Sequence, residues 1–365
     1  MKKILVIGSA RPNFMKIAPI LAELRRYPET FTPLFIHTGQ HYDANLSQSF
    51  LDNLGIGQPD TSLGIGSGSE AVRTARVMEA FESIVLEEKP TAVVVVGDVT
   101  PTMACTLVCS KLWIPVVHVE AGLRSFDRRM PEEINRLVTD SIADLLLTPS
   151  QEAEEHLLRE GVAPERIHFV GNVMIDTLIQ CRPKIDQARV LDNLGICRQG
   201  YTLLTLHRPS NVDEEASLIE ILESLMEIGA QMPIVFSIHP RTRKMIDEFR
   251  LTDRFNAIPN LIELEPQPYF DFLKLQSSAR MVLTDSGGVQ EETTFLGVPC
   301  LTLRENTERP VTISMGTNEL VGPHKDAILR ETTRILNGQA KQGRIPDLWD
   351  GHAAERIVTL LKTAF

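Results

Sequence analysis

The chain has 365 residues, and its 37 lysines and arginines against 48 aspartates and glutamates give a net charge of −11. This length predicts two domains, and the acidic balance argues against nucleic acid or an anionic membrane surface as the main partner. The five cysteines form no C-x-x-C pair, so we expect small buried residues and no metal site. The longest apolar stretches, such as Ala92–Val96, are too short to cross a bilayer, and the amino end predicts the first strand of a cytoplasmic protein.

Short apolar runs rich in β-branched residues alternate with helical patterns along the chain. In chain order we expect strands at residues 3–8, 33–39, 92–98, 115–122, 144–150 and 167–172, and then at 201–207, 233–240, 261–266, 280–288 and 299–304. Helical patterns, for example Glu70–Glu88 and Ala216–Gly229, lie between most of them. This alternation predicts an α/β fold built twice over, with two parallel sheets that helices cover on both faces.

The division between the two domains is predicted between Leu178 and Tyr201, where the sequence is polar and irregular in period. We assign residues 1–175 to the first domain and 176–365 to the second. Ligands of open parallel sheets collect at the carboxyl ends of the strands. Charged residues and glycines follow the strands of both halves, so we expect the two sheet edges to face each other across a cleft.

The segment "DSGGVQEE" follows a predicted strand and opens a helix. It would offer the N–H groups of Ser286, Gly287 and Gly288 to a diphosphate, while Glu292 could accept hydrogen bonds from ribose hydroxyls. The alternative is an ordinary N-cap followed by two acids that suit the helix dipole. Because capping explains neither the paired glycines nor both acids, we favour a nucleotide or nucleotide sugar as the ligand.

The segment "GSARPNFMK" after the first strand resembles a phosphate-binding turn. It lacks both G-x-G-x-x-G and the Walker pattern, so neither dinucleotide nor Walker chemistry is implied. Arg11 could clamp a phosphate, or it could be a surface residue. Lys16, at the end of the segment, is a second substrate-binding candidate.

Three carboxylates follow the strands of the first half or open the next helix: Asp98, Glu120 and Glu132. A carboxylate after four valines is poorly solvated, and such a group is costly unless it is paired or used. The alternative for Asp98 and Glu120 is a salt bridge to Arg124 or Arg128, and for Glu132 it is ordinary placement in a first helical turn. Three such groups together favour acid–base catalysis.

Two histidines, His207 and His239, each follow a predicted strand. A single histidine at such a place is more often structural, but His207 next to Arg208 fits a cationic group over a phosphate site. His118 lies inside a strand, and we expect it to be packed in the core.

The motifs "HVEAGLRS…MPEEINR", "GNVMID", "TLHRPSN" and "DSGGVQEE…LGVPCLTLRENTERP" occur in this order over nearly the whole chain. Together they resemble the UDP-N-acetylglucosamine 2-epimerases, in particular the non-hydrolysing type. The resemblance implies two Rossmann-like domains facing a central cleft, as in the GT-B glycosyltransferases, with UDP held mainly by the second. It also implies a last helix, about residues 352–365, that crosses back to the first domain, a homodimer, and no metal or other cofactor.

Residue by residue, the family's catalytic carboxylates match Asp98, Glu120 and Glu132. Its phosphate contacts match Arg11, His207, Ser286, Gly287 and Gly288, its ribose contact matches Glu292, and Phe272 falls beside the uracil; His207 is also counted with the catalytic candidates. The chain departs from the family in two places. Its first turn carries Asn13 where the usual G-T-R-P-E has a glutamate, and Gln40-His41-Tyr42 replaces the Q-H-R of members that their own substrate activates.

The leading hypothesis is reversible inversion at C2 of a UDP-linked 2-acetamido sugar through elimination and return of UDP. Two faces of C2 require at least two acid–base groups, and a departing diphosphate requires fixed N–H donors and positive charge. A glycosyltransferase would need one base, and a nucleotide-sugar sensor would need no acids. A hydrolysing epimerase, a second acetamido group or a C6 carboxylate on the sugar all stay open.

Overall fold

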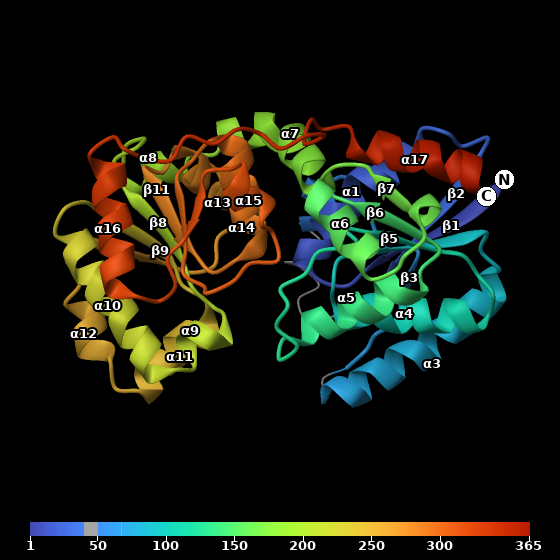
Figure 1. Ribbon diagram of the computed structural model, residues 1–365, viewed down its shortest axis with the longest axis horizontal. Helices are drawn as coiled ribbons and strands as arrows, with labels where there is room; N and C mark the ends of the chain where they lie inside the picture. Colours follow the sequence, from blue (N-terminus) through green and yellow to red (C-terminus); the bar gives the residue numbers. More distant parts are fainter. Residues whose placement is uncertain (40–49, 67) are drawn as a thin grey trace. The chain divides into compact units, whose positions relative to one another are not determined.

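The computed structural model describes residues 1–39, 50–66 and 68–365, which form two compact units (Figure 1). The first unit contains Met1–Gln180 and Asp347–Phe365, and the second contains Cys181–Pro346. The boundary falls inside helix α7 (Val173–Gln187), so the segment that looks irregular in the sequence is partly helical. Within the described residues, no helix is both long enough and apolar enough to span a bilayer.

The first unit is built on a parallel sheet that has seven strands within the described residues, in the order β3-β2-β1-β4-β5-β6-β7. The strands are β1 (Lys2–Gly8), β2 (Phe31–His37), β3 (Thr61–Ser62), β4 (Ala92–Val96), β5 (Val116–Val119), β6 (Leu145–Thr148) and β7 (Ile167–Phe169). Its helices, besides part of α7, are α1 (Arg11–Arg25), α3 (Glu70–Glu88), α4 (Thr100–Lys111), α5 (Pro131–Ile142), α6 (Gln151–Arg159), the short 3-10 helix η1 (Pro164–Arg166) and α17 (Ala353–Ala364).

The second unit repeats this design with a parallel sheet of six strands in the described residues, in the order β10-β9-β8-β11-β12-β13. The strands are β8 (Thr202–Thr205), β9 (Ile234–Ser237), β10 (Leu261–Leu264), β11 (Met281–Thr284), β12 (Cys300–Thr302) and β13 (Asn318–Leu320). The helices are α8 (Val190–Leu194), α9 (Pro209–Val212), α10 (Glu215–Gly229), α11 (Pro240–Glu248), α12 (Thr252–Asn256), α13 (Tyr269–Ser278), α14 (Gly287–Leu296), α15 (Val311–Ser314) and α16 (Lys325–Leu336).

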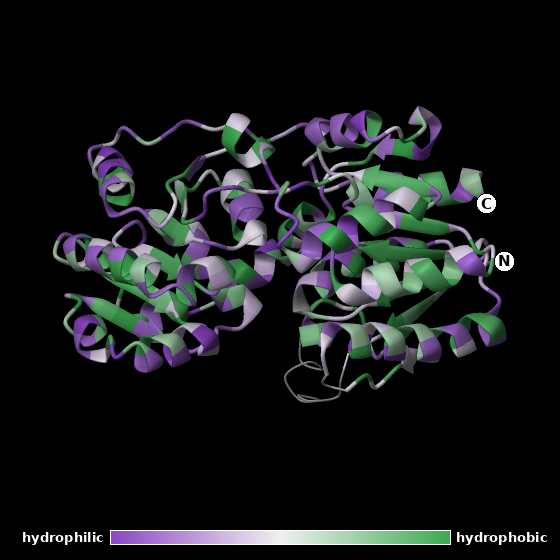
Figure 2. Cartoon of the chain, turned by 60° about the horizontal axis from the view of Figure 1, so that its bottom comes forward, coloured by the Kyte–Doolittle hydropathy of each residue, from purple (hydrophilic) through white to green (hydrophobic). Residues whose placement is uncertain are grey.

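The predicted α/β fold is confirmed, and the strands are apolar in both units (Figure 2). All five residues of β4 are buried, as expected for a strand that helices cover on both faces. The two-residue strand β3 and the three-residue strand β13 were not expected from the sequence. Both lie at sheet edges and are too short to show a period.

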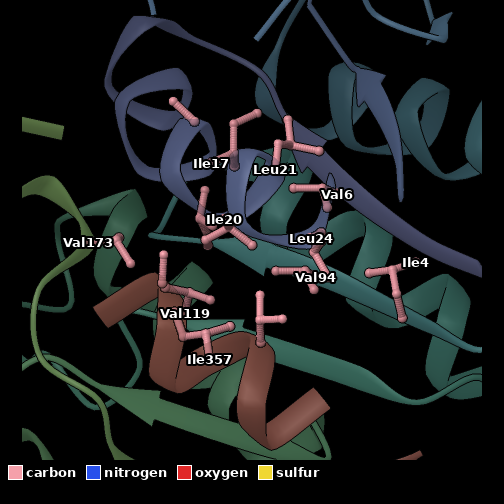
Figure 3. Packing of buried hydrophobic residues seen from close by; sticks show 14 of the residues in the cluster. Ile4, Val6, Ile17, Ile20, Leu21, Leu24, Val94, Val119, Val173 and Ile357 are labelled. Carbon is pink, nitrogen blue, oxygen red and sulfur yellow. The ribbon is translucent and has the colours of Figure 1, made fainter. Parts of the chain in front are cut away.

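The last helix, α17, packs on the first unit, as expected from the family resemblance. Ile357 of α17 lies in one buried cluster with Ile17 and Ile20 of α1 and with Val119 of β5 (Figure 3). The buried Asp176 of α7 accepts hydrogen bonds from the first two backbone N–H groups of α17, at 3.2 and 2.8 Å. The chain therefore leaves the first unit, builds the second and returns to complete the first.

The strand order reverses once in each sheet, between β1 and β4 in the first unit and between β8 and β11 in the second. Loops that leave neighbouring strands at such a point diverge to opposite faces, which opens a place for a ligand at the carboxyl ends. In this chain the loops after β1, β4, β8 and β11 carry most of the candidate site residues.

Candidate active site

The turn after β1 is closed by Asn13, the residue that departs from the family pattern. Its Oδ1 accepts from Ser9 Oγ at 2.5 Å and from the backbone N–H of Ala10 at 3.3 Å. Its Nδ2 donates to the carbonyl of Val96 in β4 at 3.3 Å. Asn13 thus ties the β1 loop to the neighbouring strand across the reversal of strand order. Arg11 is the first residue of α1.

Glu120, directly after β5, forms an ion pair with Lys16 of α1, and the side chains are 6% and 7% exposed respectively. Gly97 lies beside this pair with a φ of +66°, and a Cβ added there would stand 3.1 Å from Lys16 Nζ and 3.7 Å from Glu120 Oε2. Glu120 itself has a φ of +71°, a strained conformation for a residue with a Cβ. The surrounding contacts therefore hold this carboxylate in a costly but defined position.

Asp98, one residue after Gly97, is held by two residues of α5. Arg136 Nη2 donates to Asp98 Oδ2 at 2.5 Å, and Asn135 Nδ2 donates to the Asp98 carbonyl at 2.9 Å. Arg136 is in turn oriented by Glu133, whose Oε2 accepts from Arg136 Nη1 at 2.9 Å. Asp98 therefore belongs to a chain of ion pairs that begins deep in the unit.

Glu133 was not expected from the sequence, which drew attention to its neighbour Glu132. Its carboxylate is buried and accepts from the backbone N–H groups of Ser125 and Phe126, at 2.9 and 3.0 Å, and from Ser125 Oγ at 3.0 Å. With Arg136 as a further donor, Glu133 is fully engaged. It serves to position Arg136 and the loop after β5.

The alternative interpretation, that Asp98 and Glu120 form salt bridges, holds in kind, but their partners are Arg136 and Lys16 and not Arg124. Arg124 instead donates to Asp140 Oδ2 at 2.7 Å and to both carboxylate oxygens of Glu160, at 2.8 and 2.6 Å. The sequence interpretation failed here because Asp140 and Glu160 are distant in the sequence and become neighbours only when the fold forms.

A cavity of about 530 Å³ opens beside Asp98 in the first unit. Asp98, Glu132 and Asn135 line it, as do Glu70 and Arg73 of α3. The structure thus brings Asp98 and Glu132 to one cavity, and Glu120 lies next to the same loop through its contact with Gly97. The space is large enough for a sugar.

In the second unit, Asp285 organises the loops after β8 and β11. Its Oδ2 accepts from the backbone N–H groups of His207 and Arg208 at 2.9 and 2.8 Å, and from Asn211 Nδ2 at 3.3 Å. The distance from His207 Nδ1 to Asp285 Oδ1 is 2.9 Å. Burial alone would raise the pKa of Asp285, but the His207 ring and the two backbone N–H groups lower it below its ordinary value.

These contacts fix the His207 ring through Nδ1. Among the described residues, Nε2 has no protein partner, and the side chain is 35% exposed. The ring of His239 lies 5.7 Å from it, and burial followed by the charge of His207 lowers the pKa of His239. His207 is therefore oriented to present a nitrogen to a ligand.

Helix α14 begins with the two glycines of the predicted anion site, and Ser286 is its N-cap. The Ser286 side chain caps no N–H group of the helix, so the interpretation of this residue as an ordinary side-chain cap does not hold. A Cβ on Gly287 would stand 2.6 Å from Arg309 Nη1 and 2.9 Å from Glu308 Oε1, so a side chain at this position would displace that buried ion pair. Gly288 is the second residue of the helix. Its N–H group and that of Gly287 are in the first turn, where no intrahelical partner exists.

Glu292 lies one turn into α14, where it is 3% exposed. Tyr269 of α13 donates to its Oε1 at 3.3 Å, and Gln276 also forms a hydrogen bond with it. Burial raises the pKa of Glu292 to about 8, against the lowering effect of these two donors. Phe272, also on α13, is half-buried against the core beneath the sheet. The other acid of the pair, Glu291, contacts Arg309 Nε at 3.0 Å and is structural.

Two further expectations from the sequence concern the segment Gln40-His41-Tyr42 and a metal site. Gln40-His41-Tyr42 lies outside the described residues. In the part of the chain that the structure describes, no group of three or more His, Cys, Asp and Glu side chains is arranged to hold a metal ion.

The sequence profile of the family described as UDP-N-acetylglucosamine 2-epimerase matches residues 22–362. The chain belongs to this family. The epimerase family thus accounts for both units, since the match runs from α1 to α17.

Relatives within the epimerase family cover the chain from end to end. It is 42% identical to the UDP-N-acetylglucosamine 2-epimerase of Methanocaldococcus jannaschii, over 98% of each chain. It is 39% identical to the UDP-2,3-diacetamido-2,3-dideoxy-D-glucuronate 2-epimerase of Pseudomonas aeruginosa, over 98% of this chain and 99% of the relative. A crystal structure of the M. jannaschii epimerase with UDP-GlcNAc and UDP matches with a TM-score of 0.91 at 41% identity, over 99% of each chain.

Proposed function

We propose that this protein interconverts UDP-N-acetylglucosamine and UDP-N-acetylmannosamine by inverting C2, with elimination and return of UDP. The observation that carries the proposal is the gathering of Asp98, Glu120 and Glu132 around the loop after β4. The names of the relatives from M. jannaschii and P. aeruginosa support the same class of reaction, since both are 2-epimerases of UDP-linked sugars.

The first unit supplies the acid–base groups of the proposed reaction. The C2 proton is only weakly acidic, so a carboxylate must remove it as the C1–O bond to UDP breaks. Protonation of the resulting unsaturated sugar from the opposite face, with return of UDP to C1, gives the epimer. The pairs Asp98–Arg136 and Glu120–Lys16 keep two of these carboxylates in fixed positions.

The second unit supplies the anion-binding groups. The N–H groups at the start of α14, the Ser286 hydroxyl and His207 would hold the diphosphate and stabilise its charge as it departs. Glu292 would accept from the ribose hydroxyls, and Phe272 would lie beside the uracil. Arg11 completes this proposed set of substrate-binding residues.

The charge of the cavity favours a neutral sugar over a uronate. Glu70, Asp98 and Glu132 line the cavity, where Arg73 offsets the charge of Glu70 and Arg136 offsets that of Asp98. These carboxylates thus outnumber their cationic partners by one, and a carboxylate at C6 would meet this excess negative charge. We therefore place N-acetylglucosamine ahead of the diacetamido glucuronate named for the P. aeruginosa relative.

The proposal is tested by turnover of UDP-N-acetylglucosamine in deuterium oxide, followed by proton NMR. Both epimers should lose the C2 proton signal as solvent deuterium replaces it, and UDP should stay attached. Unlabelled C2 in the product would contradict proton removal, and accumulation of UDP with free N-acetylmannosamine would instead show the hydrolysing reaction. A cytoplasmic homodimer is part of the same proposal, and light scattering after size exclusion tests the dimer.

A further inference from the structure

His118 lies at the centre of β5 and is fully buried. Its Nδ1 is 2.6 Å from Asp140 Oδ1, and its Nε2 is 2.8 Å from the carbonyl oxygen of Gly97. The ring therefore bridges helix α5 to the loop after β4, the loop that carries Asp98. This contact is more than the core packing that the sequence predicted for His118.

Both atoms that face the His118 ring are hydrogen-bond acceptors. A backbone carbonyl can only accept, and Asp140 accepts through its other oxygen from Arg124 Nη1 at 2.7 Å and from the Gly122 N–H at 3.1 Å. Arginine keeps its charge in proteins, so these donors stabilise the ionised carboxylate. Burial opposes ionisation of Asp140, but His118 and Arg124 lower its pKa below the ordinary value.

We propose that His118 is a positioning residue with a proton on both ring nitrogens, which fixes the Gly97–Asp98 turn by donating from Nε2 to the Gly97 carbonyl. Neutral imidazole carries one N–H and would leave one of these two buried acceptors without a donor. The cationic form satisfies both contacts. The surrounding charges balance it, because His118 and Arg124 are matched by Asp140 and Glu160.

The contact matters because Gly97 is held on both sides of its Cα. Its N–H donates to the carbonyl of Val119 at 3.0 Å, and its carbonyl accepts from His118. Rotation of the following peptide would move Asp98 away from Arg136 and would disturb the space beside the Glu120–Lys16 pair. A displacement of about 1 Å at a reacting group can cost on the order of 10²-fold in rate.

Two matched substitutions separate the two hydrogen bonds. His118→Gln places an amide N–H near the position of Nε2, and His118→Asn places one near that of Nδ1. Both remove the ring and its charge, but only His118→Gln keeps a donor for Gly97. We expect kcat to fall about 100-fold in His118→Asn and less than about tenfold in His118→Gln, with the same KM and UDP affinity in both. This catalytic consequence rests on the proposed epimerase function.

A control variant accounts for loss of stability alone. Val85→Ala creates a cavity in the core between α3 and the sheet, where no candidate site residue lies. It should lower the melting temperature and leave kcat unchanged. Equal kcat in His118→Asn and His118→Gln, or a kcat loss that follows melting temperature across all three variants, would overturn the positioning role.

A measurement without substrate keeps the proposal separate from the epimerase function. In protein labelled with ¹⁵N-histidine, the His118 signals, assigned by their loss in His118→Gln, should show a proton on both ring nitrogens at neutral pH. The Asp98 amide ¹⁵N shift should move in His118→Asn and stay in place in His118→Gln. One bare ring nitrogen, or an Asp98 shift equal in both variants, would overturn the proposal even in an active enzyme. If the protein fails to epimerise, these signals still decide it.

Discussion

The two points where strand order reverses place their carboxylates in opposite ways. In the first unit, Asp98 and Glu120 stand at strand ends and pair with the cationic side chains of Arg136 and Lys16. In the second unit, the strand-end carboxylate Asp285 is fully buried and accepts from two backbone N–H groups, and its Oδ1 lies 2.9 Å from His207 Nδ1. The same backbone framework therefore carries two different kinds of site.

The difference teaches that the partners of a strand-end carboxylate indicate its role. A carboxylate that pairs with a side-chain cation beside a cavity, as Asp98 does, stands where a substrate can reach it. Asp285 instead holds the backbone N–H groups of His207 and Arg208 and lies against the His207 ring. It therefore fixes the shape of the loops and leaves Nε2 of His207 to face a ligand. The first edge suits proton transfer and the second suits anion binding.

The largest effect should come from the carboxylates of the first unit. We expect Asp98→Asn, Glu120→Gln and Glu132→Gln each to lower kcat by about 10²–10⁴-fold, because the amides keep the shape but cannot exchange a proton. UDP affinity, measured by calorimetry, should stay unchanged because the proposed nucleotide-binding groups lie in the other unit. Glu87→Gln, a change of the same kind on the exposed face of α3, is the control and should keep full activity. Full activity in all three variants would contradict the assignment of proton transfer to the carboxylates of the first unit.

The second prediction tests Asp285, the buried carboxylate of the second unit. Asp285→Asn removes the negative charge and replaces one carboxylate oxygen with an NH2 group, which cannot accept from the N–H groups of His207, Arg208 and Asn211 as Oδ2 does. Loss of a charge-assisted hydrogen bond costs about 1.5–3 kcal/mol, which corresponds to roughly 10–100-fold weaker UDP binding. Titration calorimetry measures this loss. A variant that binds UDP like the parent but loses kcat would show that Asp285 belongs to the chemistry.

The third prediction concerns the buried Glu292, whose pKa is raised to about 8 by burial. Below this pKa the carboxyl group carries a proton and accepts from ribose hydroxyls more weakly than the carboxylate does. UDP should therefore bind more tightly at pH 9 than at pH 7, by up to about tenfold, because the ionised fraction rises through the pKa. In Glu292→Gln this dependence should vanish, and binding at pH 9 should weaken. A parallel pH dependence in parent and variant would contradict the assignment.

The smallest effect sharpens the comparison with Asp285. Asp176 also accepts two backbone N–H bonds, but no histidine ring is paired with it, and burial raises its pKa to about 6. Because the folded protein then binds the proton more tightly than the unfolded chain, the contribution of Asp176 to stability falls as pH rises from about 4 to about 6. The melting temperature of Asp176→Asn relative to the parent should therefore rise over this range. The rise should be about 2–4 °C for each kcal/mol that the parent loses in free energy of unfolding. A constant difference would show that two N–H donors suffice for a buried carboxylate.

The sequence predicted both sheets and placed Asp98 and Glu120 correctly at strand ends, because apolar strands and the residues after them are local features. It did not predict the buried polar face of α5, where Glu133, Arg136 and Asp140 lie at spacings of three and four residues. A helix with such a pattern normally turns its polar face to water, so the sequence alone favours the wrong side. The surroundings of Glu292 were equally hidden, since its partners come from another helix.

The return of α17 to the first unit has a consequence for biosynthesis. The ribosome makes this helix only after the whole second unit, so the first unit cannot bury the face of α1 that receives α17 until synthesis reaches residue 353. The second unit, which is continuous in the chain, can complete its core earlier. A nascent chain that is cut short before α17 would thus carry a folded second unit and an exposed apolar surface on the first, a form suited to recognition by chaperones.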